Sequence, residues 1–359
     1  TRALSSAASD VYKRQTSNHS KGSENTYMNI YDIAELAGVS IATVSRVVND
    51  SPKVSEKTKA KVRAVMEQNH YTPNVFARGL GLNSMKTVGI ICPDVSDDYM
   101  AGSVAYLEKS LRTYGYDCIL YCSGYQYQDK VNAVELILKK RIDALLLVGS
   151  HYAGDGEEAS TKYIAKAARE VPVFLINGYI HCQGVYCVLS DNYQIMYDTV
   201  SALTEAGRKR ILFLYDSNSY SAAEKMRGYE EALRDNDLPI QKELEIFEEN
   251  KILKVRDRLL AQENLEFDAV VATDDGLAVG AVKYARQKGL SVPEDINIIG
   301  FNNSELAVCC EPELSSIDSR SEMLCKTAVD SMMMALNGHP VRHKKTIPCC
   351  FIKRRTTNF

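Results

Sequence analysis

The chain has 359 residues, of which 45% are hydrophobic and 25% are charged, and its formal net charge is −3. This length exceeds one ordinary domain of about 100–200 residues, and the composition is that of a globular protein rather than a disordered, collagenous or disulfide-scaffold chain. We expect a cytoplasmic protein with reduced thiols and no membrane contact, because no apolar run approaches the roughly 20 residues of a membrane helix, no signal-peptide pattern is seen, and no CxxC pair occurs.

Residues 1–27 show no hydrophobic period and are rich in Ser, Thr and Asn. We expect them to be a disordered or non-native leader. The run at residues 10–15 (DVYKRQ) looks like the translation of a transposon end used in sequencing libraries, and we expect the natural chain to begin at Met28. Residues 28–86 then carry more basic than acidic groups, whereas residues 87–359 are net acidic. This uneven distribution of charge favours a basic, phosphate-binding domain attached to a net acidic domain.

Residues 30–49 (IYDIAELAGVSIATVSRVVN) predict two short helices joined by a tight turn. Gly38 permits the turn, Ser40 can cap the second helix, and Ser55 can cap a third. The side chains expected to close a small core are Ile33, Ala34, Ala37, Val44, Val47, Val48, Ala60, Val62, Val65 and Met66. The pattern predicts a helix-turn-helix domain over residues 28–73. A three-helix interaction bundle is the alternative, but it needs neither the spacing of small residues nor the exposed polar face of the second helix.

Residues 74–86 predict a hinge helix or linker, and the pattern changes at Thr87. Apolar runs expected as buried strands lie at 88–92, 118–121, 144–148, 173–176, 185–189, 211–215, 269–272 and 296–299. Amphipathic patterns expected as helices lie at 101–114, 130–140, 162–170, 195–206, 225–235, 277–288 and 322–336. This alternation predicts parallel sheets, and its length favours two lobes. We expect one lobe at 87–208 and 318–340 and the other at 209–317 and 341–359.

The stretch at 31–49, then Val54-Ser55, Lys57-Thr58 and the stretch at 70–74 (HYTPN), resembles the DNA-binding domain of the lactose repressor/galactose repressor family. The resemblance implies that Ile41 and Ala42 occupy base-reading positions and that Arg46 reaches the major groove. It implies phosphate contacts by four polar side chains near the recognition helix, namely Thr43, Ser45, Asn49 and Ser55. Ser40, at the start of that helix, is also expected to belong to the DNA-binding surface. Because Ile41 and Ala42 are apolar, we expect them to contact thymine methyls and Arg46 to bond a guanine edge.

Residues 74–82 (NVFARGLGL) resemble the hinge helix of the same family. The resemblance implies that Leu80 enters the minor groove at the operator centre and that Ala77 makes the neighbouring contact. The alternative is that Leu80 packs against the larger module. Gly79 and Gly81 each disfavour a helix by about 0.8–1 kcal/mol relative to alanine. We therefore expect the hinge to form only on DNA, which amide exchange with and without operator would test.

Landmark stretches follow one another along the rest of the chain, among them those at 87–93 (TVGIICP), 142–148 (IDALLLV), 273–281 (TDDGLAVGA) and 292–301 (VPEDINIIGF). In this order they resemble the effector domain of this family, which is similar to periplasmic sugar-binding proteins. The implied fold class is an all-α helix-turn-helix domain plus an α/β effector module of two doubly wound parallel-sheet lobes. Ligands of such folds bind between the lobes at the carboxyl ends of strands. The polar candidates there are Ser96, Asp98, Tyr99, Asn177, Asn192, Arg227, Asp274 and Asn302. Carboxylates and amides suit a sugar, although a turn or cap role is the alternative for each.

The expected function is a ligand-responsive, sequence-specific transcription regulator, expected to be a repressor. Its expected partners are a second copy of the chain, a pseudo-palindromic double-stranded operator and a sugar effector, with no cofactor or metal. A stand-alone binding protein with a vestigial helix-turn-helix is one alternative. An enzyme on the same scaffold is another, but the sequence shows no P-loop, no GxSxG, no HExxH and no GxGxxG after a strand, and no catalytic residue is predicted.

Overall fold

The computed structural model describes residues 28–48, 50–71, 84–154, 158–262 and 264–359. The chain divides into two compact units, of which one ends at Asn83 and the other begins at Ser84. Three predicted DNA contacts, Asn49, Ala77 and Leu80, lie outside the described residues, as does most of the predicted hinge. None of the helices within the described ranges is long and apolar enough to cross a membrane.

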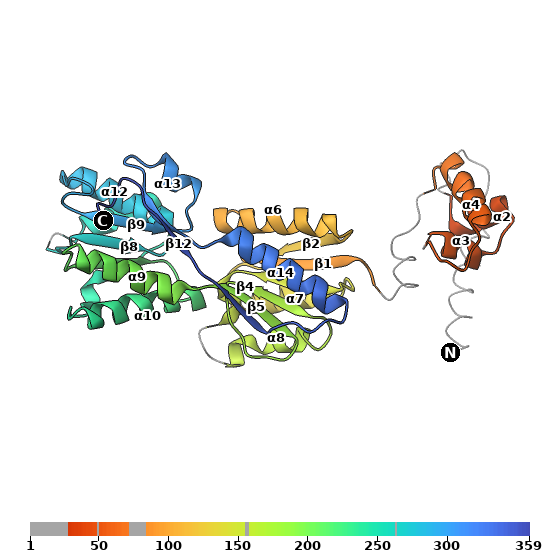
Figure 1. Cartoon of the computed structure of the whole chain (residues 1–359), viewed down its shortest axis with the longest axis horizontal. Helices are drawn as coiled ribbons and strands as arrows, with labels where there is room; N and C mark the ends of the chain where they lie inside the picture. Colours follow the sequence, from red (N-terminus) through yellow and green to blue (C-terminus); the bar gives the residue numbers. More distant parts are fainter. Residues whose placement is uncertain (1–27, 49, 72–83, 155–157, 263) are drawn as a thin grey trace. The chain divides into compact units, whose positions relative to one another are not determined.

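The first unit contains the three predicted helices, α2 (Ile30–Ala37), α3 (Ile41–Val48) and α4 (Glu56–Gln68) (Figure 1). Gly38 ends α2 with a φ of 58°, a backbone conformation that glycine adopts without strain. The predicted core side chains of α2 and α3 are buried or half-buried. The third helix differs from expectation, since it exposes Ala60 and buries Lys59. Burial of Lys59 is tolerated because its ammonium pairs with Asp50 at 3.1 Å and Glu56 at 2.9 Å.

The first lobe of the second unit is a six-stranded sheet in the order β11-β5-β4-β3-β1-β2, and every neighbouring pair is parallel. Its central strands are apolar on both faces because helices cover both sides. The strands are β1 (Thr87–Cys92), β2 (Asp117–Cys122), β3 (Ala144–Val148), β4 (Val173–Ile176), β5 (Val185–Ser190) and β11 (Lys344–Ile347). The helices are α6 (Asp98–Thr113), α7 (Tyr127–Leu138), α8 (Lys162–Ala167) and α14 (Ser321–Leu336), with short 3₁₀ turns η1 (Ser150–Ala153) and η2 (Glu158–Thr161).

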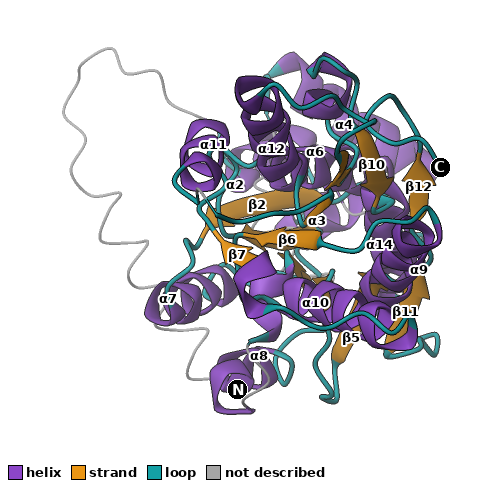
Figure 2. Cartoon of the chain, turned by 90° about the vertical axis from the view of Figure 1, so that its left-hand side faces the viewer, coloured by secondary structure: helices purple, strands orange, loops and turns teal. Residues whose placement is uncertain are grey.

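The second lobe repeats this arrangement in the order β12-β10-β9-β8-β6-β7, with the edge strand β12 antiparallel to β10. The strands are β6 (Ile211–Tyr215), β7 (Glu245–Phe247), β8 (Ala269–Ala272), β9 (Asn297–Phe301), β10 (Ser315–Asp318) and β12 (Cys350–Ile352). The helical segments are α9 (Asn192–Glu205), α10 (Tyr220–Asp235), η3 (Lys242–Leu244), α11 (Ile252–Leu260), α12 (Asp275–Lys288) and α13 (Glu305–Cys309). Helices α11 and α12 cover one face of this sheet, and α9 and α10 cover the other (Figure 2).

Two boundaries of the lobes differ from those expected. Helix α9 belongs to the second lobe, because Met196, Val200 and Leu203 pack with the side chains of β6. Strand β11 belongs to the first lobe, because it pairs with β5. The second unit also begins slightly before Thr87, since the Asp143 carboxylate accepts hydrogen bonds from the backbone N–H groups of Met85 and Thr87 and from the hydroxyl of Ser84. The chain thus crosses between lobes after β5, after β10 and after β11.

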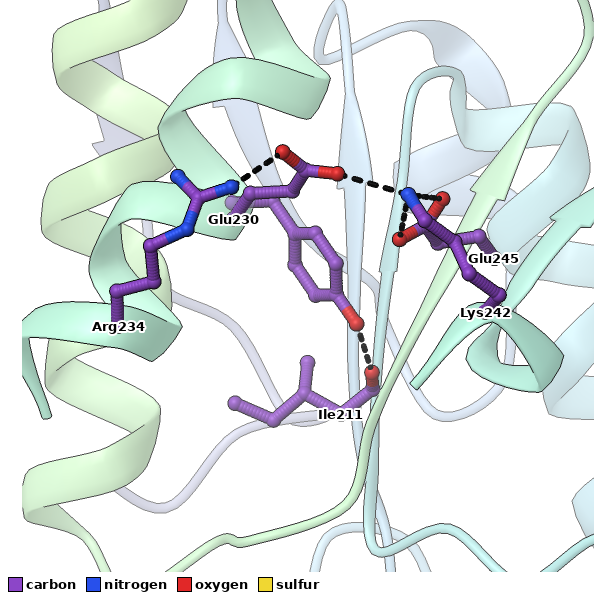
Figure 3. A network of polar contacts seen from close by, with 6 residues as sticks. Ile211, Glu230, Arg234, Lys242 and Glu245 are labelled. Atoms are coloured by element: carbon purple, nitrogen blue, oxygen red, sulfur yellow. Dashed lines mark hydrogen bonds and ion pairs between the residues drawn. The ribbon is translucent and has the colours of Figure 1, made fainter. Parts of the chain in front are cut away.

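Helix α10 is fixed firmly against its sheet. The Tyr229 hydroxyl is buried and donates to the Ile211 carbonyl of β6 at 2.8 Å. At the surface, Glu230 bridges Arg234 and Lys242, and Lys242 also binds Glu245 at the start of β7 (Figure 3). In each of these pairs the cation is exposed to solvent, so each contributes modestly and the buried tyrosine is the stronger anchor. The anchoring matters because the opposite end of α10 reaches the space between the lobes.

Candidate functional site

Helix α3 carries the predicted DNA-binding face. Ile41, Ala42 and Arg46 are exposed on it, while Val44 and Val47 are buried against α2 and α4. Ser40 begins the helix as predicted, because its hydroxyl accepts from the backbone N–H of Thr43 at 3.2 Å. The face is therefore an apolar pair beside one long cation, on a helix whose first turn leaves backbone N–H groups available to a phosphate.

Two of the predicted phosphate ligands also act as helix caps or cap partners. The Ser55 hydroxyl accepts from the Thr58 N–H at 3.3 Å at the start of α4. The Thr43 hydroxyl lies 2.9 Å from that of Ser40. Ser45 is half-buried. These hydroxyls have lone pairs or protons left for a phosphate, but their positions are set first by the protein.

A pocket of about 540 Å³, including its part open to solvent, lies between the two lobes of the second unit. It sits where β1, β3 and β4 of the first lobe and β6, β8 and β9 of the second lobe end. In the first lobe β1 lies between β3 and β2, and in the second lobe β6 lies between β8 and β7. The strand order therefore changes direction at β1 and at β6, and doubly wound folds bind ligands at such a point.

The structure brings together four of the eight predicted ligand residues. Tyr99, Asn177, Asp274 and Asn302 line the pocket. Asn192 lies behind them, buried, with its amide donating to the Asn177 side chain at 3.2 Å. The other three, Ser96, Asp98 and Arg227, are exposed and do not line the pocket.

The sequence predicted Asp98 as a pocket residue, but the carboxylate that faces the pocket is that of its neighbour Asp97. Asp97 caps α6 by accepting from the Met100 N–H at 2.9 Å, and it lines the pocket. Asp98 is the first residue inside the helix and points to solvent. Burial raises the pKa of Asp97, and the carboxylate of Asp274 in the other lobe raises it further.

Lys225 is the pocket cation that the sequence analysis missed. It is 5% exposed, and its ammonium donates to the Thr273 carbonyl at 2.9 Å and lies 3.4 Å from the centre of the Phe301 ring. Burial lowers the pKa of Lys225 to about 8, although Asp216 and Asp274 oppose the decrease. Arg227, two residues along α10, instead pairs with Glu224 at 2.9 Å and covers the Tyr193 ring.

Helical spacing could have identified Lys225. Ser221, Ala222, Lys225, Tyr229 and Ala232 are buried, at the three- and four-residue spacing of one helix face. Arg227 lies two residues, and so about 200°, from Lys225 around the helix axis. The apolar pattern of α10 thus marks Lys225 as inward-facing and Arg227 as outward-facing.

Asp274 is held at the end of β8 by three hydrogen bonds. Its carboxylate accepts from Gly276 N–H at 2.8 Å, from Asn250 at 2.8 Å and from Asn302 at 3.0 Å. The adjacent Asp275 points inward instead, where it accepts from Ser304 and Ser316. Of this acidic pair only Asp274 faces the pocket.

Asp216 follows β6 and lines the pocket from the second lobe. Burial raises its pKa to about 6, with a further contribution from Asp274, while Lys225 opposes the rise. Thr273, only 5% exposed, also lines the pocket, and its hydroxyl has no hydrogen-bond partner among the described residues. A buried unsatisfied hydroxyl beside carboxylates, amides and an ammonium suits a ligand with several hydroxyl groups.

His151 supplies an uncharged ring to the pocket wall. Burial and then the charge of Lys130 lower its pKa to about 4, so it is neutral at pH 7. Across the described residues, no cluster of three or more His, Cys, Asp or Glu side chains is arranged to hold a metal ion.

Both parts of the chain match known protein families. Residues 29–74 match the model of bacterial regulatory proteins of the lacI family, and residues 200–357 match that of the periplasmic binding protein-like domain. The chain is 48% identical over 334 residues to an HTH-type transcriptional regulator of Lachnoclostridium phytofermentans, covering 92% of this chain and 100% of that protein. It is 31% identical over 293 residues to catabolite control protein A of Priestia megaterium, covering 80% and 86% of the two chains.

Solved structures show the same fold. The lac repressor dimer bound to operator and the anti-inducer ONPF superposes with a TM-score of 0.83 at 24% identity, covering 92% of this chain and 99% of that chain. The complex of the transcriptional regulator CelR with cellobiose superposes with a TM-score of 0.66 at 22% identity, covering 92% and 99%. The protein is a transcription regulator with a helix-turn-helix DNA-binding domain and a periplasmic-binding-protein-like domain. It belongs to the lacI family of bacterial regulatory proteins.

Proposed function

We propose that the protein is a homodimeric repressor whose operator affinity is controlled by a sugar bound between its lobes. The observation that carries the proposal is the composition of the pocket. Polar side chains from both lobes converge on it, so a bound ligand would hold the lobes in one relative orientation. A ligand that binds one orientation better must shift the equilibrium between them. It would thereby alter any function that depends on that equilibrium.

The pocket chemistry supports a sugar as the effector. Asp97, Asp216 and Asp274 accept from hydroxyl groups, Lys225 donates to them, and Asn302 can do both. The side chains come from two lobes, so a small polyol could bridge them. The solved complexes of lac repressor with ONPF and of CelR with cellobiose are consistent with this choice. No catalytic role is proposed for any of these residues.

The exposed face of α3 supports specific DNA recognition. We propose that Ile41 and Ala42 contact thymine methyls and that Arg46 bonds a guanine edge, with Ser40, Thr43, Ser45 and Ser55 on phosphates. The lac repressor in the superposed structure is an operator-bound dimer, and the same two-fold arrangement here predicts a pseudo-palindromic site. Asn49, Ala77 and Leu80 complete the proposed DNA contacts. Chromosomal DNA as the target implies a place in the cytoplasm.

Mobility-shift assays of the full chain on the DNA upstream of its own gene and of its neighbours test this proposal. One segment should outcompete random DNA, and its affinity should fall steeply with salt. Arg46→Ala should lower specific affinity by roughly 10–100-fold, because a bidentate base contact is worth about 1–3 kcal/mol. Arg234→Ala, an exposed arginine on α10, is the matched control and should leave binding unchanged.

The sugar arm of the assay adds candidate sugars to the protein–operator complex. A cognate sugar should change operator affinity by about 5–150-fold, the usual range for coupling between two sites. Lys225→Met should remove that response without changing operator affinity in the absence of sugar. Failure of the dimer to prefer any DNA segment over random DNA would refute the proposal.

A further inference from the structure

Tyr125 is an exposed aromatic residue at the edge of the interlobe pocket that the functions described above do not use. Its side chain is 49% exposed. Its ring meets that of His151 edge to face, with centroids 4.8 Å apart and planes at 79°. His151 lines the pocket, so Tyr125, which does not itself line it, is the solvent-exposed neighbour of a pocket residue. The two rings form a corner with two apolar faces.

The corner is rigidly placed. The loop after β2 is tied to the end of β1, because Ser123 N–H donates to the Cys92 carbonyl at 2.9 Å and Gly124 N–H donates to the Pro93 carbonyl at 2.8 Å. On the other side, the Lys130 ammonium donates to the His151 carbonyl at 2.9 Å. The backbone that carries the two rings is therefore tied to the ends of the strands.

Carboxylates from both lobes are close enough to this corner to affect the pKa of Tyr125. Burial raises the pKa of Tyr125 to about 12, and the carboxylates of Asp97, Asp94 and Asp216 add to the rise. Asp216 belongs to the second lobe and lines the pocket, so Tyr125 of the first lobe lies within electrostatic reach of a pocket carboxylate of the other lobe. An aromatic face beside carboxylates is suited to a sugar ring, whose C–H groups stack on the aromatic while its hydroxyls donate to the carboxylates.

Tyr127 is a comparison residue for Tyr125, because it is equally exposed but has different neighbours. It lies two residues along the chain and is also 49% exposed. Its ring, however, packs edge to face on Tyr163 at 5.9 Å, and Tyr163 belongs to the core beneath the first sheet. Tyr127 thus covers the lobe's own core, whereas Tyr125 packs on His151, a residue of the pocket wall.

We propose that Tyr125 and His151 form a second sugar subsite, so that the effector is a disaccharide or a longer oligosaccharide. One ring binds among Lys225, Asp274 and Asn302, and the next ring stacks on Tyr125 at the opening. This inference rests on the proposed function, because it assigns the chain length of the sugar that controls the regulator. Tyr125 is then a specificity-determining residue that separates oligosaccharides from their monosaccharides.

The absence of tryptophan from the sequence gives a direct test. Tyr125→Trp and Tyr127→Trp each create a protein with one tryptophan, at the subsite and at the matched control position. Titration would use paired probes: glucose with cellobiose and maltose, galactose with lactose, and xylose with xylobiose. At least one disaccharide should change the emission of Tyr125→Trp, while its monosaccharide does not. The emission of Tyr127→Trp should stay constant throughout.

Calorimetry on the full chain supplies the second readout. The active disaccharide should bind about 2–13-fold more tightly than its monosaccharide, as expected for one added stacking contact. Tyr125→Ala should bring this ratio close to one and leave monosaccharide affinity unchanged. Tyr127→Ala should preserve the ratio.

Three results would overturn the inference: equal affinity for a disaccharide and its monosaccharide, unchanged Tyr125→Trp emission on binding of a disaccharide, or no binding of any sugar in the panel. Operator binding is measured on the same protein preparations. If it persists when the sugar results are negative, the inference fails while the DNA-binding half of the proposed function stands. Loss of specific DNA binding with the disaccharide preference intact would instead count against the proposed function.

Discussion

Replacing Lys225 by methionine should make the ligand-free protein more stable, although it removes a cation from the binding pocket. The pKa of Lys225 falls from 10.5 to about 8 because burial penalises its charged form. At about 1.4 kcal/mol for each tenfold loss of proton affinity, this corresponds to roughly 3 kcal/mol of destabilisation near pH 7. Methionine has a similar shape but forgoes the hydrogen bond to Thr273 and the contact with the Phe301 ring, about 1 kcal/mol each.

The net expectation is a gain of about 1 kcal/mol, which would raise Tm by roughly 2–4 °C. Urea unfolding at several pH values is the appropriate assay. Between about pH 8 and 10.5 the unfolded chain keeps the Lys225 proton that the folded chain loses, so the parent protein gains stability as pH rises. The advantage of the variant should therefore shrink by pH 10.

Lys166→Met is the matched control, since Lys166 is an exposed lysine of α8 paired with Glu135 at 3.2 Å. It should change the free energy of unfolding by less than about 0.5 kcal/mol, with no comparable trend in pH. The reasoning is refuted if Lys225→Met lowers the free energy of unfolding at pH 7, or if its gain does not diminish at high pH. Either result would mean that the buried ammonium stabilises the free protein.

Three further substitutions are informative. Asp216→Asn should raise Tm at pH 7.5 more than at pH 5, because burial raises the pKa of Asp216 to about 6 and the folded state loses stability as pH rises towards that value. Arg227→Ala should leave the sugar affinity measured by calorimetry unchanged. It should lower the free energy of unfolding by less than about 1 kcal/mol, since the ion pair of Arg227 is exposed. Weaker sugar binding would contradict the assignment of Lys225, rather than Arg227, as the pocket cation. Gly228→Ala should destabilise by about 1–3 kcal/mol in urea, because its Cβ would lie 2.4 Å from the Tyr193 carbonyl oxygen, whereas Gly102→Ala on open helix surface should not.

Local sequence patterns determine much of the secondary structure of this protein. The turn at Gly38, the cap at Ser40 and the burial of Val44 and Val47 all follow from residues close in sequence. The alternation of apolar runs with amphipathic stretches similarly predicted β1–β6, β8 and β9 and most helices of the lobes, but not the strands β7, β10, β11 and β12 or the helices α11 and α13. Asp274 and Asn302 were found because side chains that directly follow strands must lie at the sheet edge where a ligand binds.

Long-range pairing was beyond those patterns. The apolar pattern of helix α9 is compatible with packing on either lobe. Only its contacts with β6 assign it to the second lobe. Strand β11 is short and half-exposed, and its place beside β5 depends on residues about 160 positions away in sequence. The predicted lobe boundaries were therefore displaced at these two elements.

The direction of individual side chains was the other property that only the tertiary structure decided. Lys225 and Arg227 are two residues apart, and each is a plausible ligand-binding cation by residue type alone. The packing of α10 on its sheet turns Lys225 into the pocket and Arg227 towards solvent. Asp97 and Asp98 differ in the same way, as do Asp274 and Asp275. Sequence identifies the segments that reach the pocket. Which of two neighbouring residues lines it depends on the face that the surrounding structure buries, and that face is set by contacts with distant parts of the chain.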